Sequence, residues 1–420
     1  MFLEDSSQPY PDVAYEGNTM ELPLHKRNLR VLWFGNFFIG VGISCFTPFV
    51  PLFIDTLGEF SKQELSFYSG IVVAAPFLMM ALISPVWGRL ADRKGRKLML
   101  LRSSLGMSIF TIATSLVTNV WMLLIVRAVF GLFSGFISNS IALMAVQVPK
   151  EKSGKALGTL NTANVAGMLF GPIFGGTVVS FIGYRSLFLI SGSVSFLVFL
   201  LTLILVKENF TPVAKGQTRS IKHVLSTVSK PHLILGMYLA TLIVMTTEFA
   251  VNPIISLYVR DLLPTDWNLE FWSGVSAAAP GLTTIICSRR LGTLGDRVGT
   301  HKILIFGLII QLSVYLPLAF VNAIWQLIVL RLFIGVANAA LLPSVQAILS
   351  RNAPIESTSC VFAYNQSAQS IGMVIGPLVG SSINGFFSFR YVFFATMAFS
   401  SINLINVLIN TRKQKDTDNE

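Results

Sequence analysis

The chain has 420 residues, of which 53% are hydrophobic and only 12% are charged, and its formal net charge is +11. A mean hydropathy of +0.68 is too apolar for a soluble domain of this length, because a soluble surface needs many more charged groups. The composition therefore argues against a soluble enzyme or binding domain and predicts an integral membrane protein.

The predicted elements are membrane-spanning helices. Residues 1–26 contain acidic side chains but no apolar run, which predicts a disordered cytoplasmic tail rather than a signal peptide. A spanning helix needs roughly 20 apolar residues, and such runs recur along most of the remaining chain. In chain order they cover 28–55, 66–88, 98–117, 120–147, 156–180, 184–206, 232–258, 269–288, 302–321, 324–349, 358–384 and 388–410. The predicted parts are a tail (1–26), a six-helix bundle (27–206), a cytoplasmic connector (207–231), a second six-helix bundle (232–410) and a cytoplasmic tail (411–420).

Lysine and arginine mark one side of this arrangement. They cluster in the amino-terminal segment, in the loops after even-numbered spans, in the connector and at the carboxyl terminus, whereas the other side holds only Lys62, Arg185, Arg260 and Arg390. Short basic loops stay in the cytoplasm, so both termini are expected to be cytoplasmic. The net positive charge is then a topology signal, and no nucleic-acid partner is expected.

Cysteine and histidine give no sign of a metal site. Cys45, Cys287 and Cys360 all fall inside predicted spans without a CxxC spacing, and the four histidines fall at cytoplasmic edges. No metal, disulfide or other cofactor is predicted.

The two halves are related by an internal repeat. The segment Gly88–Lys97 recurs as Gly292–His301 at an offset of 204 residues, and Arg127 with Gly131 recurs at the same offset. Gly167, Gly171, Pro172 and Gly175 recur as Gly372, Gly376, Pro377 and Gly380 at an offset of 205. Transporters built from two such parallel repeats bind their substrate between the halves.

Several motifs carry a family resemblance. The segment GRLADRKGRK from Gly88 is similar to the signature loop of the major facilitator superfamily, and its weaker copy begins at Gly292. The glycine-rich stretch Gly167–Gly176 resembles the antiporter motif of exporters, and Thr47–Pro51 and Arg127 with Gly131 resemble two further motifs of twelve-span drug:proton antiporters. The order of these segments most resembles multidrug, fluoroquinolone-type efflux pumps of Gram-positive bacteria. This resemblance implies an all-α fold of twelve helices in two pseudo-symmetric bundles, and export as the direction of transport.

The signature loop and its copy form a candidate conformational latch. Asp92 can accept hydrogen bonds at a helix end, and the arginines can make charged contacts across the bundle. Alternatively, these charges only fix the topology. The latch residues are Gly88, Asp92, Arg93, Gly95, Arg96, Asp296 and Arg297.

The antiporter motif is a candidate hinge in the fifth span. Glycines at four-residue spacing let a neighbouring helix approach closely, and a proline adds a local kink. The alternative is ordinary packing of small residues. The motif residues are Gly167, Gly171, Pro172, Gly175 and Gly176.

Glu248 is the acidic residue that lies well inside a predicted span, where a charge is costly. Its position in the seventh span predicts a place in the outer half, and Pro253 is expected to bend the same helix. Because burial favours the neutral form of a carboxylic acid, Glu248 can hold a proton, release it when a cavity opens, and then attract a cationic drug. The alternative is a glutamate satisfied by a polar neighbour with no role in transport.

Two arginines are paired by the repeat inside the fourth and tenth spans. The family resemblance places Arg127 in proton coupling, together with Glu248 and Asp92 as the other candidates. A buried arginine needs a partner, and either Arg127 or its mate Arg331 can instead extend to the outer interface.

Four amides and one aromatic side chain are candidates for the substrate cavity. Asn161 and Asn164 map at offset 205 onto Gln366 and Gln369, which places amides three residues apart on one helix face in each half. Phe249 is a candidate for an apolar surface that suits flat lipophilic cations. Hydrogen bonding between helices without substrate contact is the alternative for the amides.

The sequence therefore predicts a monomeric secondary transporter in the cell membrane, in contact with membrane lipid, that exports lipophilic or cationic drugs in exchange for protons by alternating access. No phosphate-binding loop is present in the connector, so the energy is expected from a proton gradient rather than ATP. A dedicated exporter of one metabolite, such as a sugar or amino acid, is the alternative. An enzyme is not expected, because the spans hold no catalytic triad, paired carboxylates or metal ligands.

Overall fold

The computed structural model describes residues 24–208, 231–264, 268–353 and 358–418 of the chain, and the regular structure within these ranges is helical. Residues 1–23 of the predicted tail and 209–230 of the predicted connector lie outside the described residues. The first helix begins at Leu24, before the predicted boundary at 27, and the last helix runs past residue 410 to Asp418.

The N-terminal half contains the helices up to residue 205. Its elements are α1 (Leu24–Ser44), η1 (Thr47–Phe49), α2 (Val50–Asp55), α3 (Lys62–Lys94), α4 (Arg96–Thr114), α5 (Val120–Phe133), α6 (Phe136–Gln147), α7 (Lys150–Ile182) and α8 (Tyr184–Leu205). Local signals set several of these boundaries. Ser61 and Glu64 form a capping box at the start of α3, and Asn119 accepts a hydrogen bond from the Met122 amide at the start of α5.

The C-terminal half repeats this order. Its elements are α10 (Pro231–Val251), η2 (Asn252–Ile254), α11 (Ile255–Leu262), α12 (Leu269–Val298), α13 (Thr300–Leu318), α14 (Ile324–Asn352), α15 (Thr358–Phe386) and α16 (Phe389–Asp418). Apolar residues dominate these helices, as a lipid environment requires.

Three predicted spans are interrupted. The first and seventh spans each contain a short 3-10 turn with a proline, Pro48 in η1 and Pro253 in η2, so the α-helix of the seventh span is interrupted at the proline where a bend was predicted. The fourth span was expected to be one helix but divides into α5 and α6. Gly135, at the division, has φ +124°, a conformation that glycine adopts without strain.

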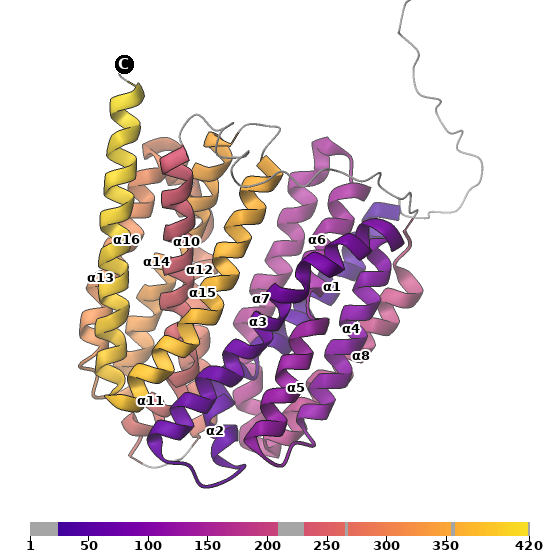
Figure 1. The fold of residues 1–420 in the computed structure, drawn as a ribbon, viewed down its shortest axis with the longest axis vertical. Coiled ribbons are helices and arrows are strands. Elements are labelled where there is room, and N and C mark those ends of the chain that lie inside the picture. Colours follow the sequence, from indigo (N-terminus) through magenta and orange to yellow (C-terminus); the bar gives the residue numbers. More distant parts are fainter. Residues whose placement is uncertain (1–23, 209–230, 265–267, 354–357, 419–420) are drawn as a thin grey trace, which may run out of the picture.

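The number of spans is only partly supported. Nine helical segments among the described residues are long and apolar enough to cross a membrane, and α4, α12 and α15 are not in that set. Figure 1 nevertheless shows these three helices running alongside the others. The all-α class is confirmed, and the count of twelve stays a prediction.

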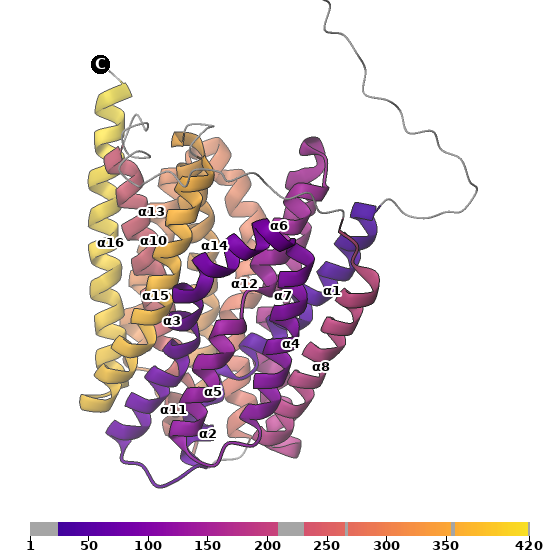
Figure 2. The same cartoon turned by 45° about the vertical axis from the view of Figure 1, so that its right-hand side comes forward.

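The two halves use the same helix contacts. In the N-terminal half α1 packs on α7, α3 on α5 and α4 on α8, and in the C-terminal half α10 packs on α15, α12 on α14 and α13 on α16. Figures 1 and 2 place α4 and α8 at one edge of the molecule and α13 and α16 at the opposite edge. Between the halves, α3 packs along α15 and α7 along α12. These four helices form the interface where a substrate site is expected.

The two ends of the molecule differ. At the end that holds α2 and α11, buried apolar side chains from both halves form one cluster, which includes Phe49 and Phe53 from one half and Ile254 and Ile255 from the other. We call this the sealed end. The opposite end, where the C-terminus lies in Figure 1 and where α3 and α12 end in basic residues, is called the basic end.

Candidate functional site

The antiporter-motif glycines lie on two faces of α7. Gly167 and Gly171 pack against α1 in the same half, and Gly175 packs against Cys45 just after α1, so closely that an added Cβ at any of them would overlap these neighbours. Gly176 and Pro172 face the other way, and an added Cβ at Gly176 would lie 2.5 Å from the carbonyl oxygen of Glu270 in α12. The motif therefore joins the interior of one half to the interface between the halves.

The C-terminal half repeats this packing in register. Gly372, Gly376 and Gly380 of α15 pack against the backbone of α10. Each residue that they contact lies 205 positions after the residue that the corresponding glycine of α7 contacts in the N-terminal half. The interface repeats as well, because Gly70 of α3 lies against the carbonyl of Pro377, as Gly274 of α12 lies against that of Pro172. The glycine frame thus belongs to both halves and is not peculiar to the antiporter motif.

The interface opens toward the basic end. On α3, Ser66 receives a hydrogen bond from the Asn384 amide in α15 at 2.9 Å, and the same helix face continues to the exposed residues Ser84 and Gly88. On α12, the face that meets α7 at Gly274 and Gly281 likewise continues to exposed residues, among them Ile285, Arg289 and Gly292. The faces of α7 and α15 that meet the other half also continue into exposed residues toward the basic end. The packed contacts lie nearer the sealed end, and the exposed faces border an opening at the basic end.

The predicted cavity residues divide between this opening and the packed region. Asn161 and Gln366 are exposed on the interface faces of α7 and α15, whereas Asn164 and Gln369 are half-buried. The Asn164 Oδ1 is buried and has no hydrogen-bond partner among the described residues. Phe249 of α10 is buried and packs edge-on against Phe77 of α3, with ring centroids 5.3 Å apart. Their role in substrate binding stays a prediction.

Glu248 lies near the end of α10, next to Phe249 and just before η2, in the half of that helix nearer the sealed end. It is half-buried and interacts electrostatically with Arg331 of α14 and Tyr315 of α13. Its helix neighbour Thr247 lies 3.5 Å from the Gln311 amide, which also lies 3.3 Å from the Tyr315 hydroxyl. The carboxylate makes no hydrogen bond or close ion pair with any residue in the described ranges.

The two repeat-related arginines have different surroundings. Arg331 is 7% exposed, and its Nε donates a hydrogen bond to the Ser276 carbonyl of α12 at 2.7 Å. Arg127 instead lies over the rings of Phe46 and Phe130, at 5.2 and 4.8 Å from the ring centroids. Its buried Nε has no hydrogen-bond partner among the described residues.

The predicted latch makes its contacts within each half. Arg96 donates to the Ala142 carbonyl of α6, while the Glu208 carboxylate caps α4 by accepting hydrogen bonds from the amides of Arg96 and Lys97 at 3.0 and 2.7 Å. Gly95 ends α3 with φ +94°.

The copy of the latch in the C-terminal half is held by an ion pair. Asp296 pairs with Arg351 of α14 at 2.9 Å. Gly88, Arg93 and Arg297 are exposed, and the Asp92 side chain lies outside the described part of the structure. The latch role stays a prediction.

Polar contacts at the sealed end were not predicted. Asp55 of α2 and Arg260 of α11 form an ion pair at 2.8 Å, and the Tyr184 hydroxyl donates to Glu270 at 3.0 Å. Asp55 and Arg260 are 205 residues apart, so the repeat offset, applied to charged residues, was the signal that could have found this pair.

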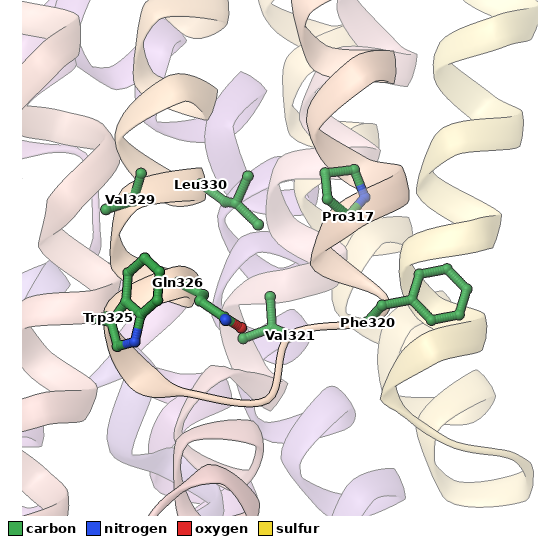
Figure 3. A pocket seen from close by; sticks show the side chains of 7 residues that line it. All are labelled: Pro317, Phe320, Val321, Trp325, Gln326, Val329 and Leu330. Atoms are coloured by element: carbon green, nitrogen blue, oxygen red, sulfur yellow. The ribbon is translucent and has the colours of Figure 1, made fainter.

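A groove of about 330 Å³ lies between α13 and α14 near the sealed end (Figure 3). It is lined by Pro317, Phe320, Val321, Trp325, Gln326, Val329 and Leu330. None of the predicted cavity residues lines it, so it is separate from the interface opening.

Comparison with known proteins identifies relatives over nearly the whole chain. The family model of the Major Facilitator Superfamily matches residues 32–287 and 237–420. The Multidrug resistance protein MdtG of Enterobacter lignolyticus is 44% identical over 92% of this chain and 93% of its own length. MdtG of Salmonella paratyphi B is 43% identical over 94% of this chain and 98% of its own length.

These relatives correct one expectation. The predicted resemblance to Gram-positive fluoroquinolone-type pumps is not supported, because the relatives come from Gram-negative enterobacteria. The glycine motif could not make this distinction, because its contacts serve helix packing in both halves of the chain.

Solved structures show the same fold at low identity. A bacterial homologue of the human lysosomal transporter Spinster, in an inward-facing and occupied conformation, has a TM-score of 0.75 at 15% identity, covering 93% of this chain and 98% of that one. The human organic anion transporter MFSD10 (TETRAN) has a TM-score of 0.70 at 13% identity, covering 92% of this chain and all of that one.

Proposed function

The chain belongs to the Major Facilitator Superfamily, as a multidrug efflux transporter of that family, and from this premise we propose that it exports lipophilic or cationic drugs in exchange for protons. Alternating access would come from rocking the two halves about the interface of α3, α7, α12 and α15. In this state the drug enters from the open basic end, and the apolar cluster at the other end blocks its exit.

The observation that carries the proton coupling is the place of Glu248. It lies in a membrane-spanning helix, and its chain neighbour Phe249 packs on Phe77 across the interface between the halves. A change in the protonation of Glu248 therefore changes the charge next to the Phe249–Phe77 contact. This contact joins the two halves, so it must rearrange when the halves rock.

We further propose that the basic end faces the cytoplasm and that the protein lies in the bacterial inner membrane as a monomer. The helix ends on this side hold Arg93, Arg96, Arg297 and Arg351, in keeping with the bias of lysine and arginine toward the cytoplasmic side. The opening would then admit drug from the cytoplasm, the direction that efflux requires.

The test separates coupling from binding. Efflux of ethidium from cells and its exchange across proteoliposome membranes would be measured for the wild type and Glu248→Gln, with and without an uncoupler. We expect the substitution and the uncoupler each to reduce proton-driven efflux at least tenfold, whereas Glu248→Gln retains ethidium exchange, because exchange needs no net proton movement.

The matched control is Glu59→Gln, which removes an exposed carboxylate in the loop after α2. It should transport like the wild type. Efflux by the wild type that continues at full rate with the uncoupler present would rule out proton exchange. If Glu248→Gln loses exchange as well as efflux, the carboxylate is needed for binding or folding rather than coupling.

A further inference from the structure

The groove between α13 and α14 faces lipid rather than the interface between the halves. Both helices are long and apolar enough to span a membrane, and the lining residues Phe320, Trp325 and Val329 are exposed. Trp325 stands near the start of α14, and exposed tryptophans gather where lipid headgroups meet the hydrocarbon. Val329 lies about one helical turn farther along α14 (Figure 3). The groove therefore runs from headgroup depth into the region of the acyl chains.

One cation borders this groove. The guanidinium carbon of Arg390, near the start of α16, lies 5.7 Å from the centre of the Phe320 ring. Arg390 is exposed, and within the described residues its side chain forms no ion pair or hydrogen bond. A guanidinium carries five N–H donors, so Arg390 has donors available to a ligand at the edge of the groove.

The repeat shows that this freedom is particular to the C-terminal half. Arg390 corresponds to Arg185 at offset 205. The Nη2 of Arg185 donates a hydrogen bond at 3.3 Å to the carbonyl of Val117, in the turn after α4. The residue that corresponds to Val117 at offset 204 is Val321, which lines the groove. Arg390 makes no such bond to the Val321 carbonyl.

A tyrosine hydroxyl replaces the arginine in the C-terminal half. The hydroxyl of Tyr258 in α11 donates to the Leu318 carbonyl at 3.0 Å and lies 3.4 Å from the Val321 carbonyl oxygen. The residue that corresponds to Tyr258 at offset 205 is Phe53, which has no hydroxyl. Because Tyr258 supplies the donor to this turn, Arg390 is left to extend over Phe320 at the lipid-facing edge.

The groove also carries a polar side chain that its counterpart lacks. Gln326 takes the place of Met122 at offset 204. Its Oε1 accepts a hydrogen bond from the Asn322 amide at 3.0 Å, which leaves the side-chain amino group to donate. The described lining residues include no acidic side chain. Donors from Gln326 and Arg390 beside an apolar wall suit an amphiphile with an anionic head.

We propose that this groove binds an anionic phospholipid from the leaflet at the sealed end, with its phosphate on Arg390 and one acyl chain along Val329 and Leu330. A phosphate gives Arg390 the acceptor that it lacks, and a guanidinium matches phosphate oxygens in a bidentate manner. A zwitterionic lipid carries an ammonium group as well, which the guanidinium repels, so the site should prefer the anionic headgroup. The site does not depend on the proposed drug export.

The experiment compares two headgroups on the full-length protein. Native mass spectrometry in detergent would measure the affinity for the first bound phosphatidylglycerol and for the first bound phosphatidylethanolamine. The wild type should prefer phosphatidylglycerol by about fivefold, the size expected of one basic side chain at an anionic lipid surface. Arg390→Gln should bind the two lipids equally, and the exposed position of Arg390 makes a folding defect unimportant. Arg185→Gln is the matched control and should keep the preference.

A second pair of variants tests the groove itself. Val329→Trp fills the groove and should weaken phosphatidylglycerol binding severalfold. Ile125→Trp, at the corresponding exposed position of the N-terminal half, is the control and should bind like the wild type. Equal affinity of the wild type for both lipids would mean that the groove holds any bilayer chain and would overturn the proposal. A preference that survives Arg390→Gln, or full binding in Val329→Trp, would overturn it as well.

Discussion

The two halves pack their helices through the same glycine contacts, but they surround those contacts with different chemistry. In the C-terminal half Arg331 donates a hydrogen bond to the Ser276 carbonyl, α10 carries the acid Glu248, and α14 is continuous. In the N-terminal half Arg127 lies on aromatic rings and the corresponding span is divided at Gly135. The repeat therefore supplies a common scaffold, while an acid inside a span and a divided helix belong to different halves.

The largest expected effect comes from breaking the shared scaffold. Gly175→Ala and Gly380→Ala each place a Cβ against a backbone carbonyl, of Cys45 and Ala250 respectively. Overpacking against backbone costs on the order of 2 kcal/mol or more, so both variants should lose thermal stability in detergent to a similar degree. Gly158→Ala, where nothing lies within 4 Å of the added atom, is the control and should be neutral or stabilising. A loss confined to Gly175→Ala would mean that the antiporter motif has a role its repeat lacks.

A smaller effect distinguishes the divided span from the continuous one. Gly135→Ala forces a side chain into φ +124° and should cost about 1–3 kcal/mol. Its mate at offset 204 is Ala339 in the interior of α14, where Ala339→Gly should cost about 1 kcal/mol. Thermal unfolding of both variants measures this. Stabilisation by Gly135→Ala would show that the fourth span is a continuous helix after all.

The smallest effect concerns the ion pair at the sealed end. Asp55 and Arg260 are 40% and 36% exposed, so their attraction is worth at most about 1 kcal/mol. Asp55→Asn should raise the fraction of molecules that are open at the sealed end by up to about fivefold. The measurement is the rate of thiol labelling of Leu269→Cys, in a background without the native cysteines, which should rise accordingly. Exchanging the two charges, Asp55→Arg with Arg260→Asp, should restore the slow labelling. Slow labelling in Asp55→Asn itself would show that the apolar cluster alone keeps this end closed.

The repeat made much of the scaffold predictable. An offset read from Gly88 and Gly167 placed the glycine contacts of both halves in register, and the cost of a buried charge singled out Glu248. The hydrogen bond from Arg331 to the Ser276 carbonyl could not be predicted from the sequence, because the two groups meet only when α12 packs on α14. The division at Gly135 was missed, since the apolar run of the fourth span continues through it.

The ion pair at the sealed end also bears on how the halves recognise each other. Asp55 and Arg260 occupy equivalent positions and still touch, so they lie on the axis that relates the halves. Two copies of the N-terminal half arranged about that axis would bring aspartate against aspartate, and two copies of the C-terminal half would bring arginine against arginine. Like charges held this close repel, so halves expressed as separate polypeptides would be directed to assemble as unlike pairs.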